Sequence, residues 1–256
     1  MDTPLPQPVS VVLPLLLPLI LDASNNVRTQ LLKLLRALPA PDVEDHVARM
    51  LPYVRAGMTH LAADIRISAV DVLSWLVEVS GTEVVSCAGG WIKTMNCFLS
   101  VLGWHTEESV RWSASRASFG KAGSQGKPML KVLGAFAEFL EAGIGRPDVT
   151  MSDSEEDPED AGYHNIWPFP LCQTGQHMIP QTAVPYAYLN LFGQPRDEEG
   201  EMYETREDRY RVFANRFQKA IERGLENARK EGGELGRASS GATKVLKEAI
   251  AYGPGM

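Results

Sequence analysis

Apolar residues recur at intervals of three and four positions through much of the first 150 residues, a spacing that predicts amphipathic helices. Two stretches keep this spacing without a break: Leu31, Leu34, Leu35 and Leu38, and then Ala69, Val72, Leu73 and Leu76. The longest apolar stretch, Val9–Leu21, contains Pro14 and Pro18, so we expect a buried helix with a kink. Its 13 residues are fewer than the roughly 20 that span a bilayer, and we expect no membrane contact.

A second regularity is a repeat of helix pairs. A Val-Arg or Ile-Arg dipeptide opens three predicted helices, at Arg28, Arg66 and Arg111, which are 38 and 45 residues apart. Each of these helices follows another helical stretch: Val9–Leu21, Val43–Leu61 and Trp91–Trp104. Helix pairs of about 40–47 residues build HEAT and armadillo solenoids. Residues 1–150 are therefore expected to form an all-α, HEAT/armadillo-like helical solenoid, closed by a helix over Pro128–Ala142. A non-repetitive helical bundle is the alternative.

The charge of the chain is concentrated in one short segment. Residues 151–160 carry six acidic and no basic residues, whereas the whole chain has a net charge of −7. Such a segment repels itself and buries no core, which predicts an acidic flexible linker over residues 151–162. Acidic residues stand three positions after Ser152 and Ser154, a pattern typical of acidophilic kinase sites, so both are candidate phosphorylation sites. An inert spacer is the alternative.

An extended strap is predicted over residues 163–200. Tyr163–Pro195 contains five prolines and no Asp, Glu, Lys or Arg, which excludes a long helix and leaves aromatic side chains that need cover. The strap either packs along its own solenoid or binds another chain. The candidate partner-binding residues are Trp167, Phe169, Tyr186, Tyr188, Leu189 and Phe192.

Residues 201–256 are predicted to be helical again. Tyr203–Glu231 is an amphipathic helix by its spacing, Gly232 and Gly233 end it, and Ala242–Ala251 forms a short last helix. We expect these C-terminal helices to pack on the solenoid or on a partner.

Only one segment suggests a charged ligand. Five basic residues without an acid between them are candidates for phosphate or RNA contact: Arg111, Arg116, Lys121, Lys127 and Lys131. Solvated ends of a helix are the alternative. Gly120–Lys127 resembles a phosphate-binding loop, but five residues separate its glycines where the motif has four, so no nucleotide site is expected.

No catalytic, cofactor-binding or metal-binding residues are predicted. The five histidines lack a zinc-helix spacing, and His164, Cys172 and His177 are too irregularly spaced to indicate a zinc site. Cys87 and Cys97 are expected to be small core residues, and three cysteines in all point to a reducing compartment. We therefore expect a protein that is not an enzyme.

Three stretches of the sequence resemble one known family. His60–Glu78, Tyr186–Phe213 (with its YLNLFG start) and Gly224–Arg237 are similar to the Ipi-one pre-rRNA-processing family, whose animal relatives are called testis-expressed protein ten. The likeness runs from about Val9 to the C-terminus and is of fungal type. The family usually has a Lys-rich segment before its first repeat, whereas no basic residue precedes Arg28; either the sequence starts late or this segment is lost.

The resemblance implies a nuclear, non-catalytic scaffold in late maturation of the large ribosomal subunit. Its implied partners are a Rix-type helical-repeat protein, a WD-repeat Ipi-type protein, the midasin AAA-type ATPase and the pre-ribosomal large subunit, with a possible weak rRNA contact. The implied roles are removal of the second internal transcribed spacer and recruitment of midasin, in the nucleolus or nucleoplasm. Two other functions stay open: a generic HEAT-repeat adaptor of another nuclear or cytosolic complex, and an RNA-binding module that uses residues 111–131.

Overall fold

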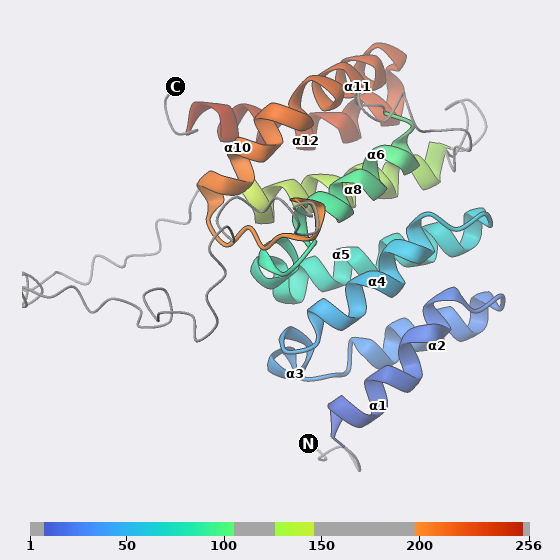
Figure 1. The fold of residues 1–256 in the computed structure, drawn as a ribbon. Coiled ribbons are helices and arrows are strands. Elements are labelled where there is room, and N and C mark those ends of the chain that lie inside the picture. The colour runs from blue at the N-terminus through green and yellow to red at the C-terminus, as the bar shows by residue number, and fades with distance from the viewer. Residues whose placement is uncertain (1–7, 105–125, 146–197, 253–256) are drawn as a thin grey trace, which may run out of the picture. The chain divides into compact units, whose positions relative to one another are not determined.

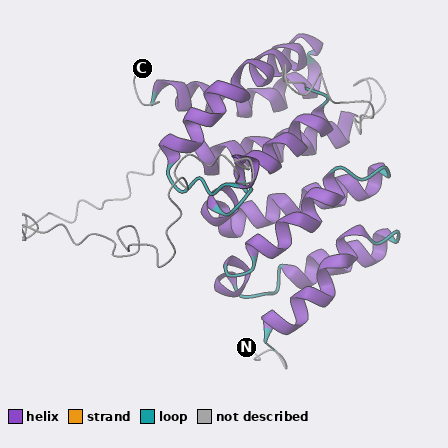
Figure 2. Ribbon diagram, viewed as in Figure 1, coloured by secondary structure: helices purple, strands orange, loops and turns teal. Residues whose placement is uncertain are grey.

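The structure, a computed structural model, describes residues 8–104, 126–145 and 198–252 (Figure 1). Every regular element in these ranges is a helix (Figure 2), so the prediction of an all-α fold is confirmed. By its contacts the chain divides into two units, Met1–Arg146 together with Glu198–Met256, and Pro147–Asp197. All the described residues belong to the first unit. The linker 151–162, and the strap up to residue 197, lie outside them.

The first unit is built from stacked helix pairs. Their elements, in chain order, are α1 (Val9–Leu16), the 3-10 helix η1 (Leu17–Leu21), α2 (Asn25–Leu35), α3 (Ala40–Glu44), α4 (Val47–Met58), α5 (Ala63–Ser86), α6 (Trp91–Leu102), α8 (Gly126–Ile144), the 3-10 turn η3 (Glu198–Gly200), α10 (Arg206–Arg216), α11 (Gln218–Glu231) and α12 (Gly233–Ala251). The pairs are η1 with α2, α4 with α5, α6 with α8, and α11 with α12.

Stacking joins these pairs in two layers. The second helices contact one another in the order α2, α5, α8 and α12, and among the first members η1 contacts α4 and α4 contacts α6. Each pair therefore completes the core of its neighbours, which is the construction of a helical solenoid. The HEAT/armadillo type of these pairs stays a prediction.

The third pair tests the sequence prediction only in part. We expected its second helix to begin near Arg111, which lies outside the described residues, and a separate helix to close the stack. In the part of the chain that the structure describes, α6 packs with that later helix, α8. The stretch Val43–Leu61 is also divided, into α3 and α4, with the chain turning at Asp45 and His46.

The first apolar stretch is kinked as expected, but only one of its faces is buried. The α-helix gives way to a 3-10 helix at Leu17 because Pro18 has no N–H for the carbonyl of Pro14. Leu13 and Leu17 are 1% and 3% exposed, whereas Leu15 is 75% exposed. The prediction of a buried, kinked helix therefore holds for the kink and for one face of the segment.

The C-terminal helices also have other bounds than expected. The stripe from Tyr203 to Glu231 breaks at Phe217, so that α10 contacts α8 while α11 contacts α12. Thr205 caps α10 by accepting a hydrogen bond from the amide of Asp208 at 3.1 Å. The last helix begins at Gly233, nine residues before Ala242, because Gly232 at φ +71° turns the chain directly from α11 into α12. The α10–α12 segment packs on α8 of the same chain.

An aromatic cluster fills the space between α6 and α8. The ring of Phe98 lies 5.2 Å from that of Phe136 and 5.5 Å from that of Phe139, with Trp91 5.1 Å from Phe139. Trp104 meets Phe136 edge-on at 5.8 Å. Aromatic pairs in these geometries add about 0.5–1.5 kcal/mol each to the gain from burial. The cluster therefore anchors the third pair, on which the C-terminal helices rest.

Candidate functional site

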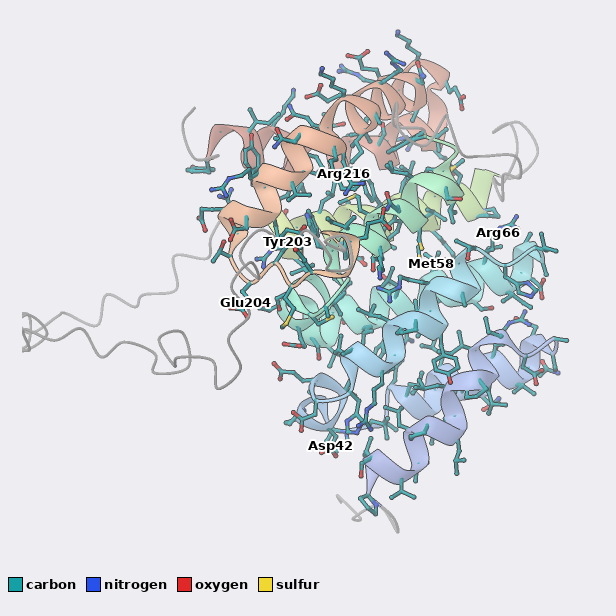
Figure 3. The ribbon with its side chains drawn as sticks, viewed as in Figure 1. Asp42, Met58, Arg66, Tyr203, Glu204 and Arg216 are labelled. Carbon is teal, nitrogen blue, oxygen red and sulfur yellow. The ribbon has the colours of Figure 1, made fainter. Side chains whose placement is uncertain are left out.

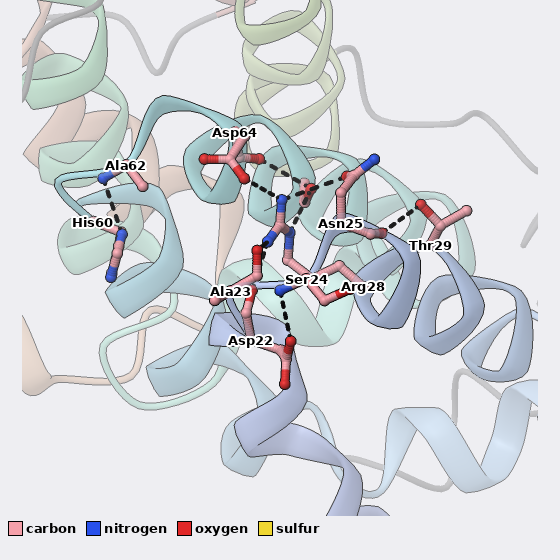
Figure 4. A network of polar contacts seen from close by, with 10 residues as sticks. Asp22, Ala23, Ser24, Asn25, Arg28, Thr29, His60, Ala62 and Asp64 are labelled. Carbon is pink, nitrogen blue, oxygen red and sulfur yellow. Dashed lines mark hydrogen bonds and ion pairs between the residues drawn. The ribbon is translucent and has the colours of Figure 1, made fainter.

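Arg28 holds the first two helix pairs together through a network of polar contacts (Figure 4). Its guanidinium Nη1 donates to the carbonyls of Asp22 at 2.5 Å and Ala23 at 3.1 Å, in the loop before α2. Its Nη2 contacts the Asp64 carboxylate at 2.5 Å and its Nε donates to the Ser68 hydroxyl at 3.0 Å, both on α5. Only 3% of Arg28 is exposed. The Arg28 hydrogen bond lowers the pKa of Asp64, so this carboxylate is ionised at neutral pH.

The same contact recurs at two further helix starts. Nη1 of Arg66 donates to the carbonyls of His60 and Leu61, each at 2.8 Å. Nη1 of Arg209 donates to those of Tyr203 at 2.7 Å and Glu204 at 2.8 Å, residues that lead into α10 (Figure 3). Each arginine is the fourth residue of its helix and reaches back five and six residues.

Burial lowers the pKa of Arg66 and Arg209, but arginine stays charged. At Arg28 and Arg66 the arginine of the dipeptide therefore closes a helix–loop junction. The sequence pattern missed Arg209 because Asp208 precedes it instead of Val or Ile; the signal available was the capping Thr205 four residues earlier.

The basic segment 111–131 is not one loop. Arg111, Arg116 and Lys121 lie outside the described residues, whereas Lys127 and Lys131 belong to α8. The ammonium of Lys131 lies 2.9 and 3.0 Å from the two carboxylate oxygens of Asp71 on α5. An acid that is 60 residues away in the sequence therefore balances the charge of Lys131. Its role as a phosphate contact stays a prediction.

Lys131 lies on the edge of a groove of about 410 Å³ between α2, α5 and α8. The groove combines apolar side chains such as Leu32 and Ile67 with the ion pairs Arg28–Asp64 and Lys131–Asp71. Each of these cations faces its own carboxylate. The mixed lining of the groove is suited to a polypeptide segment, and the stacked second helices of a solenoid are where such surfaces form.

The segment after the strap is fixed to the solenoid by short contacts. The last three residues of the predicted strap, Glu198–Gly200, form the turn η3, which contacts α6 and is therefore not extended as we expected. The Glu199 carboxylate accepts a hydrogen bond from the Asn96 amide at 3.2 Å, and the Gly89 amide donates to the Glu201 carbonyl at 3.0 Å.

Two arginines connect the chain beyond the strap to the end of α8. Nε of Arg206 donates to the carbonyl of Gly145, and Nε of Arg209 donates to that of Gly143, both at 2.8 Å. Direct hydrogen bonds thus join the two stretches of the first unit that precede and follow residues 147–197.

The thiols and imidazoles of the described residues form no reactive group. Cys87 is buried in the core and Cys97 is partly buried; burial raises the pKa of each thiol to about 11, which keeps both protonated. His46 and His60 make local contacts to the chain through Nδ1. No group of three His, Cys, Asp or Glu that could hold a metal occurs in ranges 8–104, 126–145 and 198–252, nor does a helix long and apolar enough to cross a membrane.

The other candidate residues fall in parts of the chain that the structure leaves undescribed. These are the phosphorylation candidates Ser152 and Ser154 and the six strap residues Trp167, Phe169, Tyr186, Tyr188, Leu189 and Phe192; His164, Cys172 and His177, for which no zinc site is predicted, lie there too. Their roles stay predictions.

Comparison with known proteins gives consistent matches. A family model described as a Rix1 complex component involved in 60S ribosome maturation matches residues 41–140. The pre-rRNA-processing protein ipi1 of Aspergillus fumigatus is 73% identical over 255 residues, 100% of this chain and 74% of that protein. The Neosartorya fischeri protein of the same name is 74% identical over 99% of this chain and 73% of its own length. That of Neurospora crassa is 44% identical over 96% of this chain and 68% of its own.

Proposed function

Because the chain belongs to the Ipi1 pre-rRNA-processing family, which acts in 60S ribosome maturation, we propose that it is a non-catalytic scaffold subunit of a Rix1-type complex. The family membership confirms the resemblance found in the sequence. The observation that carries the proposal is the alignment with the Aspergillus fumigatus relative, which covers this chain from end to end at 73% identity.

The arrangement of the described residues supports a scaffold in two ways. Its buried cations are used to close helix–loop junctions, as at Arg28 and Arg209, and its carboxylates Asp64 and Asp71 face cations at short distance. The stacked helices present a groove of about 410 Å³ whose mixed lining fits a segment of another protein. A solenoid of this kind binds partners along an extended surface.

The finer parts of the proposal concern the protein partners, the location in the cell and the step of ribosome maturation. We propose that the chain binds a Rix-type helical-repeat protein and a WD-repeat Ipi-type protein, and acts in the nucleolus and nucleoplasm. The assembly then supports removal of the second internal transcribed spacer and recruits the midasin AAA-type ATPase to the pre-ribosome. These parts rest on the family resemblance.

Affinity purification from the fungal host tests the proposal. The full chain, tagged at its C-terminus, is purified from nuclear extract at about 100 and 500 mM salt, and the bound proteins are identified by mass. We expect a Rix-type protein and a WD-repeat protein in stoichiometric amount at both salt concentrations, because contacts that bury apolar surface resist salt. Midasin and large-subunit precursors should accompany them at the lower salt concentration. Recovery of an unrelated assembly would overturn the proposal and leave a generic adaptor.

A further inference from the structure

A second groove, of about 520 Å³, lies between α11 and α12. Three cationic side chains line it, Arg229 from α11 and Lys244 and Lys247 from α12, together with one acid, Glu248. All three cationic residues are exposed. Arg237 stands seven residues before Lys244 on α12 and is also exposed, so the row of cations continues along that face of the helix.

The cations of this groove are poorly neutralised. Lys244 approaches Glu248 at 3.8 Å, with 78% and 36% of the two side chains exposed, which makes the pair weak. Within the described part of the chain, Arg229 and Lys247 form no ion pair. The groove at α2, α5 and α8 is different, because Arg28 and Lys131 there meet carboxylates within 3.0 Å.

The lining between the cations is small and polar. Gly236 has no side chain, and the hydroxyl of Ser240, which is exposed, donates to the carbonyl of Arg237 at 2.5 Å. The residues that line the groove include no aromatic side chain on which a base could stack. The groove therefore provides positive charge and close approach, without a platform for reading single-stranded bases.

We propose that the α11–α12 groove binds the phosphate backbone of double-helical RNA without sequence preference. Lysine and arginine side chains that are at most weakly paired with an acid bind phosphates by releasing counterions. Double-stranded RNA is recognised through its backbone, which matches a groove with cations and no aromatic side chain. The identification of this RNA as pre-rRNA rests on the proposed function, whereas binding to the duplex itself does not.

The test measures RNA binding by the full chain at several salt concentrations. A fluorescently labelled RNA duplex of about 20 base pairs is titrated with protein at salt concentrations between about 50 and 250 mM. The proteins are the wild type and the triple variant Arg229→Glu, Lys244→Glu, Lys247→Glu. We expect the triple variant to bind at least about tenfold more weakly at 100 mM salt. The slope of log affinity against log salt should become shallower by about two to three, because each cation removed leaves about one phosphate with its counterion still bound.

A control variant separates the groove from the overall charge. Lys33→Glu, Arg36→Glu, Arg49→Glu changes the net charge by the same amount at three exposed residues on and near α2 and α4. We expect this control to bind less than about threefold more weakly than the wild type. Ser240→Glu adds one negative charge inside the groove without removing a cation, and it should weaken binding several-fold while Ser240→Ala should not. Thermal unfolding within a few degrees of wild type for each variant shows that it folds.

Three results would overturn the proposal: equal weakening in the triple variant and its control, a salt slope that the triple variant leaves unchanged, or displacement of the duplex by poly-glutamate at equal charge concentration. The last result would show that the groove takes an acidic protein segment. Co-purification of the two protein partners with the triple variant keeps this test separate from that of the scaffold. If the partners prove wrong but duplex binding still depends on the groove, only the identification of the RNA as pre-rRNA fails.

Discussion

Arg209 is 6% exposed and nevertheless carries a full charge, because three backbone carbonyls accept from its guanidinium. Two of these carbonyls, those of Tyr203 and Glu204, precede α10, and the third belongs to Gly143 near the end of α8. The planar guanidinium donates hydrogen bonds to carbonyls of two separate segments at once, which a lysine ammonium cannot do. One residue thus fixes the start of the C-terminal helices against the third helix pair.

Replacing Arg209 should destabilise the protein strongly. In Arg209→Met the three carbonyls lose their donors while the apolar stem of the side chain is kept, and we expect the free energy of unfolding to fall by about 3 kcal/mol. Arg211→Met is the control, because Arg211 lies on the same helix and, among the described residues, pairs with Asp208 alone, at the surface and at 3.1 Å. The free energy of unfolding of this control should differ from that of the wild type by less than about 0.5 kcal/mol. Urea unfolding measures both; equal effects would show that the buried contacts of Arg209 add nothing.

At the scale of the element, glycines decide how closely two helices approach. A Cβ atom on Gly224 of α11 would lie 2.2 Å from the ring of Trp104, so only glycine allows this helix to lie so close to the Trp104 ring, which follows α6. A Cβ atom on Gly134 of α8, in contrast, would have no neighbouring atom within 4 Å. The two residues share a helical backbone and differ in what faces them.

The substitutions Gly224→Ala and Gly134→Ala should therefore have opposite effects. Gly224→Ala forces the Trp104 ring or α11 to move, and we expect a loss of about 1–3 kcal/mol in the free energy of unfolding. Gly134→Ala removes the conformational freedom of glycine from a helix interior and should add about 0.5–1 kcal/mol. Thermal unfolding followed by circular dichroism measures both changes. A stabilising Gly224→Ala would contradict the close approach of the two helices.

The same scale shows which elements the sequence could predict. The pairs that contain Arg28 and Arg66 were found because the arginine, its helix start and the loop it contacts lie within seven residues of one another. The break at Phe217 was missed because Phe213, Phe217 and Ile221 keep one continuous stripe of apolar residues across it. The early start of α12 was missed because Gly233, Gly236 and Gly241 lower helix propensity, which packing on α8 and α11 overrides.

Contacts between distant residues could not be predicted at all. Lys131 belongs to the basic segment, but its ion pair with Asp71 places it on the side of a groove that carries both charges. The two residues meet only because α8 lies beside α5. The groove between α11 and α12 depends in the same way on the turn at Gly232. Local patterns therefore predicted the helices and the repeat, whereas both grooves needed the three-dimensional arrangement.

At the scale of the whole molecule, the solenoid is built from two stretches of the chain, one that ends at Arg146 and one that begins at Glu198. The hydrogen bonds from Arg206 to Gly145 and from Arg209 to Gly143 connect its two parts directly. The C-terminal helices also pack on α8 and complete its core. The folded unit therefore has its own contacts across the interruption.

A double substitution in the strap distinguishes its two predicted roles. Tyr188→Ala with Phe192→Ala removes two large aromatic side chains of the YLNLFG segment. Since the described solenoid holds itself together through Arg206, Arg209 and α8, we expect the thermal midpoint of the isolated chain to change by less than about 3 °C, within the range of surface substitutions. Recovery of the protein partners should fall at least about tenfold, as for interface residues that carry much of the binding energy. Gln173→Ala with Gln176→Ala, in the same strap, is the control and should leave both quantities unchanged. A large drop in the thermal midpoint with normal partner recovery would instead show that the strap aromatics belong to the core of their own chain.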